Sequence, residues 1–238
     1  MTGPYGLQIS EACANCKLRG NNSFCQFAQP ALRDLQSIKY SSAYPQGAVL
    51  FMEKEAPRGI YVICEGQIKL TISSSEGKTL IMRIAKAGEV LGLSAVISGA
   101  PYEVTAEVLR PSQVAFVRRE DFLHFLAQHP DVARSVIAQV SAHYQTACEQ
   151  IRTLGLSSSV PERVAKLLLD WSGGSTRTKS SAHMTMPLTH EEIAEFIGTT
   201  RESVTRTLSD FKRRQLIELH GSTLTIPSRA ALEECARA

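Results

Sequence analysis

Three cysteines near the amino terminus have a spacing that suits metal or redox chemistry. Cys13, Cys16 and Cys25 lie in CANCKLRGNNSFC, which has the pattern C-x2-C-x8-C. The thiolate is the metal-binding and redox-active form of cysteine, and a two-residue gap lets both sulfurs of a pair reach one metal. The residues alone leave four interpretations open: iron-sulfur ligation, zinc binding, thiol redox sensing and a purely structural arm.

An iron-sulfur cluster usually has four thiolate ligands, so a fourth cysteine would be needed besides these three. Cys64, in the stretch VICEG, and Cys148 are the candidates, whereas Cys235 lies close to the carboxyl terminus. Both candidates also have a plainer interpretation, because a lone cysteine often packs as a small hydrophobic side chain.

A second group of polar side chains lies in TTRESVTRTLSDFKRR, residues 199–214. A helix here would bury Val204, Leu208 and Phe211 on one side. Arginine pairs with guanine, glutamate accepts from cytosine, threonine contacts the thymine methyl, and basic residues hold phosphates. The alternative is a solvated amphipathic helix. The candidate DNA-binding residues are Thr200, Arg201, Glu202, Thr205, Arg206, Ser209, Lys212 and Arg213.

The preceding residues predict the first helix of a helix-turn-helix motif. Thr189 and Glu192 have the T-x-x-E spacing of a capping box, which marks a helix start. Gly198 ends this helix, and Thr199 or Thr200 caps the next one.

The residues that follow predict a wing. LIELHGSTLTI consists of two β-rich runs around a turn that contains Gly221, as in a hairpin. Residues 173–183 predict a polar loop. Within the second helix, Glu202 lies three residues after Thr199, so it serves either as a capping partner or as a base reader.

The middle of the chain predicts strands. Residues 38–118 contain short β-rich runs such as IYVIC and IKLTIS, separated by glycine turns, which is typical of an all-β sandwich or barrel. Residues 73–77 predict an exposed hairpin tip. A short helix is expected at residues 29–36.

Residues 119–154 change to a helical period. The 3-4 spacing of their apolar residues predicts a dimer interface, and the alternative is a helix that packs on its own β domain. Residues 157–159 predict a hinge, with Ser159 capping a helix that begins near Pro161. The candidate dimer residues are Ile137, Val140, Tyr144, Ala147, Ile151 and Leu154.

Composition excludes some classes of protein. The 238 residues are 43% hydrophobic and 21% charged, which is typical of a globular chain, and a formal net charge of +3 is too small to indicate a nucleic-acid partner by itself. No signal peptide and no stretch of about 18 apolar residues is visible, so the expected location is the cytoplasm, without a membrane partner. No catalytic constellation appears, and the prediction is that the protein is not an enzyme.

On these residues the chain resembles the cAMP receptor protein and fumarate-nitrate reduction regulator (CRP/FNR) family. The resemblance is sharpest in IGTTRESVTRTLSDFKRRQLIELHG, where Arg201, Glu202 and Arg206 match the family's R-E-x-x-x-R pattern. It implies a homodimer that binds palindromic double-stranded DNA and contacts RNA polymerase. It also implies a half-site of the TGTGA kind, or of the TTGAT kind because Thr205 stands where the oxygen-sensing branch has serine.

The resemblance does not identify the effector to which the protein responds. Gly92, Leu93 and Ser94 replace the G-E-L segment of the cyclic-nucleotide branch, and no arginine lies near Tyr102, so the sequence argues against cAMP. The oxygen-sensing branch holds a [4Fe-4S] cluster on amino-terminal cysteines and a fourth cysteine in the β domain. Ala115 stands where that fourth cysteine is expected.

The predicted fold is α+β. It comprises a cysteine-bearing arm (1–28), a β-roll of the jelly-roll, cyclic-nucleotide-binding-like kind (29–128), a dimerisation helix (129–156) and a winged helix-turn-helix domain (157–238). The predicted function is transcription regulation, redox- or metal-responsive through the cysteines. A regulator that responds to a small ligand and a C-x-x-C redox enzyme are the alternatives.

Overall fold

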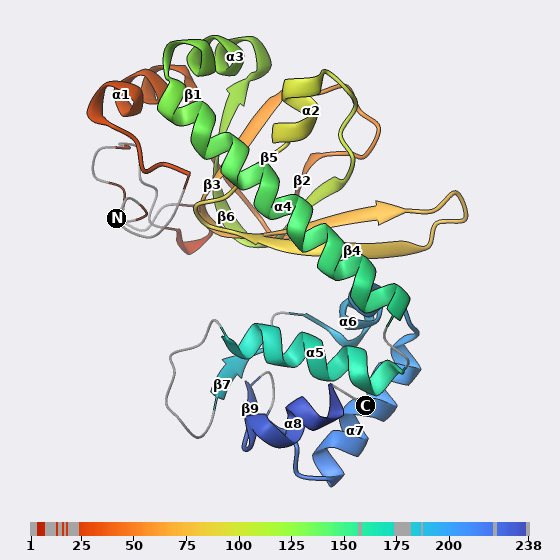
Figure 1. Cartoon of the computed structure of the whole chain (residues 1–238). Coiled ribbons are helices and arrows are strands. Elements are labelled where there is room, and N and C mark those ends of the chain that lie inside the picture. Colours follow the sequence, from red (N-terminus) through yellow and green to blue (C-terminus); the bar gives the residue numbers. More distant parts are fainter. Residues whose placement is uncertain are drawn as a thin grey trace. The chain divides into compact units, whose positions relative to one another are not determined.

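The computed structural model describes residues 4–7, 13, 16, 18, 24–156, 159–173, 182–186, 188–220 and 223–236. The chain forms two compact units, residues 1–77 with 82–146 and residues 78–81 with 147–238 (Figure 1). None of the helices in the described part of the chain combines the length and apolar content that a membrane span needs.

The first unit is built on an antiparallel sheet with the strand order β1-β6-β3-β4, in which β2 also pairs with β6 and β5 with β3. The long strands β3 and β6 pair from Gly59 opposite Arg118 to Thr71 opposite Thr105. The predicted β-rich section is therefore confirmed, as is the turn at residues 73–77, where Gly77 adopts φ 81°. The strands are β1 (Lys39–Tyr44), β2 (Val49–Phe51), β3 (Gly59–Ser73), β4 (Thr79–Lys86), β5 (Val90–Leu91) and β6 (Thr105–Arg118).

One helix interrupts this section and was missed. Helix α2 (Leu93–Ser98) begins after Gly92 (φ 79°) and ends at Gly99 (φ 77°). Both glycines adopt the left-handed conformation that other residues avoid, so they start and stop a single short helix between strands. A strand-only prediction for residues 38–118 is wrong at this point.

Two helices follow the sheet where one helical period was predicted. Helix α3 (Arg119–Gln128) and helix α4 (Pro130–Leu156) are separated at His129. Proline has no backbone N–H and disfavours helical geometry in the residue before it, and His129 accordingly has ψ 85°. The short amino-terminal helix is confirmed as α1 (Gln29–Ile38).

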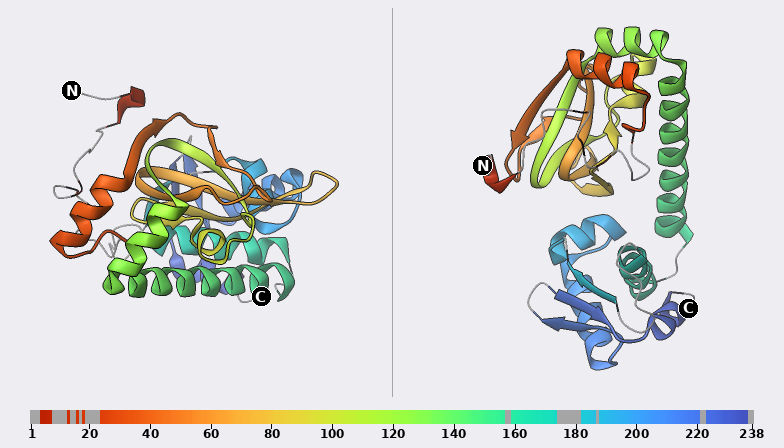
Figure 2. Two further views of the ribbon diagram at one scale, coloured as in Figure 1. Left: turned by 90° about the horizontal axis from the view of Figure 1, so that it is seen from above. Right: turned by 90° about the vertical axis from the view of Figure 1, so that its left-hand side faces the viewer.

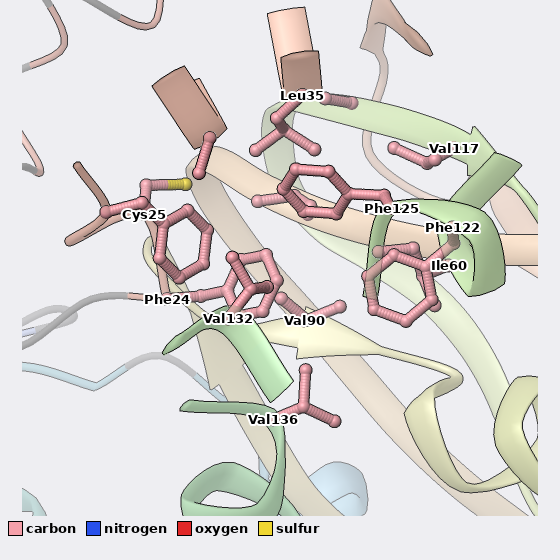
Figure 3. Packing of buried hydrophobic residues seen from close by; sticks show 14 of the residues in the cluster. Phe24, Cys25, Leu35, Ile60, Val90, Val117, Phe122, Phe125, Val132 and Val136 are labelled. Atoms are coloured by element: carbon pink, nitrogen blue, oxygen red, sulfur yellow. The ribbon is translucent and has the colours of Figure 1, made fainter. Parts of the chain in front are cut away.

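The amino-terminal arm and the start of α4 share one hydrophobic core cluster. Phe24 and Cys25 lie in the same buried cluster as Phe122, Val132 and Val136 (Figure 3). Phe24 is also held through its backbone, because its N–H donates to the carbonyl of Gly88 at 2.9 Å.

Polar contacts hold α4 to the sheet farther along the helix. Nη2 of Arg83 lies 3.0 Å from Nε2 of His143, and Arg83 also pairs with Glu89. Burial raises the pKa of Glu89, but His143 and Arg83 outweigh it, so the pKa lies below its ordinary value. This carboxylate therefore ties β4 to α4.

The second unit contains the three-stranded sheet β7-β9-β8 and four whole helices in its described residues (Figure 2). The predicted hairpin is confirmed as β8 and β9, although Gly221 lies outside the described residues. The elements are α5 (Val160–Gly173), β7 (Ala182–Thr185), α6 (His190–Ile197), α7 (Arg201–Arg213), β8 (Glu218–His220), β9 (Thr223–Ile226) and α8 (Arg229–Cys235).

The loop predicted for residues 173–183 is wrong at both ends. Gly173 ends α5, and residues 182 and 183 begin β7, which pairs with β9. Ser159 caps α5 as predicted, because its hydroxyl accepts from the Glu162 N–H at 3.3 Å. The hinge predicted at residues 157–159 otherwise falls on residues outside the described part.

The division between the two compact units falls within α4, after residue 146. The last turns of α4 contact α6, so they belong to the second unit. Gln150 donates from Nε2 to the Phe196 carbonyl at 2.8 Å, and a Cβ atom on Gly198 would meet Leu154 at 3.1 Å.

Candidate nucleic-acid interface

Helix α6 begins with the predicted capping box. The Thr189 hydroxyl accepts from the Glu192 N–H at 3.2 Å, and the Thr189 N–H donates to the Glu192 carboxylate at 2.9 Å. Gly198 ends the helix with φ 63°. The capping box sets the start of α6, and Gly198 sets its end and the turn that leads into α7.

Helix α7 is capped by Thr200, which decides between the two candidate threonines. Its hydroxyl accepts from the Ser203 N–H at 3.3 Å. The carboxylate of Glu202 is fully exposed, and its own backbone N–H together with the Thr200 hydroxyl holds the pKa of Glu202 below its ordinary value. Glu202 is therefore an ionised acceptor at the exposed start of α7, not the partner of a Thr199 cap.

The apolar side of α7 is buried as predicted. Val204, Leu208 and Phe211 are each at most 2% exposed. Thr207 shares this side, which the sequence did not indicate, and its hydroxyl donates to the Ser203 carbonyl at 2.8 Å. That internal hydrogen bond lets a polar residue occupy a buried position.

The opposite side of α7 presents the candidate base readers to solvent. Arg201, Glu202, Thr205, Arg206 and Ser209 are all exposed. Neither arginine takes part in an ion pair among the residues that the structure describes. This side combines guanidinium, carboxylate and hydroxyl groups, the mixture that major-groove recognition requires.

A contact from α6 reaches this exposed side, and sequence reasoning missed it. Nδ1 of His190 lies 2.9 Å from the hydroxyl of Thr205. The two residues belong to different helices and are fifteen positions apart, so no periodic pattern could have revealed the contact. His190 therefore restrains the side chain of a candidate base reader.

The basic end of α7 is partly neutralised. Asp210 pairs with both Arg213 and Arg214, and Arg214 also contacts the Cys235 sulfur at 3.4 Å. Lys212 is exposed and has no such pair among the described residues. Lys212 is thus better placed than Arg213 to hold a phosphate.

The candidate dimer residues divide into two sets along α4. Ile137, Tyr144 and Ile151, seven residues apart, are 65%, 72% and 66% exposed. Val140, Ala147 and Leu154 are only half-buried, and Val140 packs against the core cluster of the first unit. The first three residues thus form an exposed apolar row along α4, whereas the other three are partly covered by the chain's own packing.

The candidate metal ligands also divide. Cys13, Cys16, Cys25 and Cys64 belong to the first unit, whereas Cys148 is exposed and belongs to the second. Cys13 and Cys64 pack against the cluster that contains Cys25. No three Cys, His, Asp or Glu side chains in the described ranges lie close enough together to hold a metal without movement.

The segment after β5 is closely packed around an aromatic side chain. Tyr102 is 2% exposed, donates from its hydroxyl to the Gly59 carbonyl at 2.6 Å, and stacks on Phe51 with ring centroids 4.1 Å apart. A Cβ atom on Gly92 would meet the Tyr102 ring at 2.9 Å. The ring thus occupies the space beside the Gly92 turn.

Comparisons with known proteins agree with these features. Residues 42–129 match the model of the cyclic nucleotide-binding domain, and residues 162–235 match the Crp-like helix-turn-helix domain. The HTH-type transcriptional regulator Cmr of Mycobacterium tuberculosis is 27% identical over 236 residues, covering 96% of this chain and 89% of that regulator. The cAMP-activated global transcriptional regulator CRP of Escherichia coli is 25% identical over 198 residues, covering 83% and 94%.

The solved structure of FixK2 from Bradyrhizobium japonicum has the same fold. Its TM-score is 0.74 at 23% identity, and the match covers 84% of this chain and 98% of that one. Together, the two domain models, the curated relatives and this structure show that the chain belongs to the CRP/FNR family of transcriptional regulators.

Proposed function

We propose that the protein binds a palindromic site in double-stranded DNA as a homodimer, with α7 of each protomer in the major groove, and contacts RNA polymerase. The observation that carries this proposal is the division of α7 into a buried apolar side and an exposed side with Arg201, Glu202 and Arg206. In helix-turn-helix proteins the second helix reads base edges, which requires side chains of these types.

The exposed row on α4 supports the homodimer. Ile137, Tyr144 and Ile151 are separated by seven residues, so they lie along one side of the helix. A second copy of the helix would cover them. Two recognition helices related by a twofold axis would then read half-sites about 34–36 Å, or one turn of DNA, apart.

The same proposal assigns the signal to the cysteines of the first unit and not to a cyclic nucleotide. A bound phosphate needs a cationic or N–H-rich partner, yet no lysine or arginine occurs between residues 87 and 109. The Tyr102 ring also fills the space beside Gly92. Residues 87–109 therefore offer a cyclic nucleotide phosphate no cationic side chain of their own.

Selection from random duplexes tests the DNA-binding proposal directly. The full-length protein is expected to enrich an inverted repeat with half-sites of the TGTGA or TTGAT kind, one helical turn apart, and retention should weaken steeply with salt. Enrichment of a single half-site would contradict the homodimer. Retention without any enriched sequence would contradict the proposed specificity.

Lys212→Ala is expected to lower affinity on every duplex. Removing one phosphate contact flattens the slope of log K against log salt by about one unit for each bound protomer. Titrations at several salt concentrations measure this slope. Arg213→Ala should change it less because Asp210 already pairs with Arg213, and Lys86→Ala on the β domain is the control. An unchanged slope for Lys212→Ala would remove this residue from the phosphate contacts.

A further inference from the structure

Thr205 differs from the two hydroxyl residues that follow it in α7. The hydroxyl of Thr207 donates to the Ser203 carbonyl at 2.8 Å, and that of Ser209 donates to the Thr205 carbonyl at 2.8 Å. Serine and threonine in helices often bond the carbonyl four residues earlier in this way. The Thr205 hydroxyl instead contacts Nδ1 of His190, the first residue of α6, at 2.9 Å.

The direction of this hydrogen bond follows from the acceptors that Thr205 meets. A threonine hydroxyl carries one proton and two lone pairs, and a histidine ring nitrogen accepts only when it is unprotonated. Within the described part of the chain, the Thr205 hydroxyl makes no hydrogen bond to the Arg201 carbonyl four residues earlier. Donation from Thr205 to His190 therefore gives the hydroxyl proton a protein acceptor, whereas the opposite direction would leave it without one.

This contact reaches the side of α7 that carries the candidate base readers. Thr205 is exposed and lies three residues after Glu202 and one before Arg206, which are exposed as well. His190 is half-buried, and the capping box at Thr189 fixes the start of its helix. A ring held at the beginning of α6 thus orients a side chain on α7 before any DNA is bound.

The orientation of the hydroxyl decides which bases Thr205 can recognise. In the major groove, adenine and cytosine present amino donors, whereas guanine and thymine present acceptors without a donor. A hydroxyl that donates its only proton to His190 can only accept from DNA, so it would favour an amino group. A hydroxyl free to rotate would serve either kind of base.

We infer that His190 is a positioning residue for DNA recognition, which holds the Thr205 hydroxyl as a hydrogen-bond acceptor. Each half-site would then carry adenine or cytosine, and not guanine or thymine, on the strand that Thr205 contacts. Part of the sequence preference thereby comes from a residue that lies outside the recognition helix. This inference rests on the proposed function, because it deepens the role proposed for α7.

The other role open to His190 is a direct contact with a DNA phosphate. Phosphate contacts carry no sequence information, so their loss weakens binding to every duplex by a similar factor. The hydrogen bond to Thr205 favours the positioning role, because it engages the ring with the base-reading side of α7. Loss of the positioning role would change the ratio of affinities at one base pair.

Selection from random duplexes with wild type and Thr205→Val locates the base pair that Thr205 reads, because valine keeps the branched shape and lacks the hydroxyl. Affinities are then measured on duplexes with that base pair inverted, with deoxyuridine replacing thymidine so that the methyl group does not contribute. Wild type is expected to prefer the amino base. His190→Leu should reduce this preference by about 3- to 10-fold, the contribution of one hydrogen bond. A keto preference in wild type, no base pair read by Thr205, or an unchanged preference in His190→Leu would overturn the inference.

Two conservative variants separate the hydrogen bond from the shape of the ring. Asparagine and aspartate each place an acceptor oxygen near the position of Nδ1, so His190→Asn and His190→Asp should keep the preference to within about twofold. Aspartate also lowers affinity on every duplex through its charge, which leaves the ratio unaffected. Loss of the preference in both variants would contradict the acceptor role.

A double-mutant cycle shows whether His190 acts through Thr205. In the Thr205→Val background, His190→Leu should have no further effect on the preference. An effect that persists in this background, or an equal loss on every duplex, would refute the positioning role. His124→Leu is the matched control, because it removes an exposed imidazole from α3 of the first unit. Thermal unfolding of each variant checks that α6 and α7 are still packed.

The same measurements keep this inference distinct from the proposed function. If wild type enriches no inverted repeat, the proposed function fails and the inference fails with it. If wild type enriches an inverted repeat and His190→Leu retains every base preference, the inference alone fails.

Discussion

Ile137→Glu combined with Tyr144→Glu is expected to yield a folded monomer that no longer holds a palindromic duplex tightly. Both side chains are largely exposed in the single chain, so their replacement removes little of its own packing. In a dimer each buried apolar side chain of this size contributes about 1.5–3 kcal/mol. Because both protomers lose two such contacts and gain like charges, the dimer dissociation constant should rise by at least about a hundredfold.

Sedimentation equilibrium measures the assembly, and titration with a palindromic and a half-site duplex measures the consequence for DNA. Ala138→Glu with Gln145→Glu is the matched control. These two residues of α4 are exposed and have the same seven-residue spacing, but they lie outside the apolar row, so the control adds the same two negative charges without removing apolar contacts of the row. The control should remain dimeric. If the Ile137 and Tyr144 variant also remains dimeric, or stays monomeric with wild-type affinity for the palindrome, the interface on α4 is wrong.

Arg206→Ala and Glu202→Ala are each expected to weaken binding to the selected sequence by about 1–3 kcal/mol, which corresponds to roughly 5- to 150-fold in affinity. Both side chains lie on the exposed side of α7 and do not contribute to its buried face, so the loss should come from base recognition and not from unfolding. Affinity for an unrelated duplex should fall much less for Glu202→Ala, because it removes a negative charge. Competition titrations on both duplexes give the specificity ratio.

Arg152→Ala provides the control for Arg206→Ala, since it removes an exposed arginine of the second unit that lies on α4 and not on α7. It should retain the wild-type specificity ratio. Thermal unfolding of each variant checks that α7 is still packed. Footprints of both α7 variants that match wild type, at the same protein concentration, would refute the assignment of α7 as the recognition helix.

Local signals in the sequence were sufficient for most of the second unit. The T-x-x-E capping box, Gly198 and the spacing of Val204, Leu208 and Phe211 each depend on residues within a few positions of one another. Their physical causes, which are backbone capping, left-handed geometry and burial of one helix side, act within a single helix or turn. The helix-turn-helix and its wing could therefore be predicted before any tertiary contact was known.

The family resemblance implied the overall architecture but not how β3 and β6 pair. Cys64 lies at an irregularity in that pairing, between Ile63 opposite Val114 and Glu65 opposite Gln113. A register shift depends on how two strands separated by a long stretch of chain pair, and no periodicity within either strand records it. The sequence could name Cys64 only as one of two candidates.

The sequence by itself determined the elements whose causes are local: the glycine-punctuated strands, the capped helices, the amphipathic division of α7 and the 3-4 apolar spacing on α4. Only the tertiary structure decided which of these elements meet. It brought His190 to Thr205 and the cysteine arm to the start of α4. These contacts join residues on different elements, so they depend on packing in three dimensions and not on spacing along the chain.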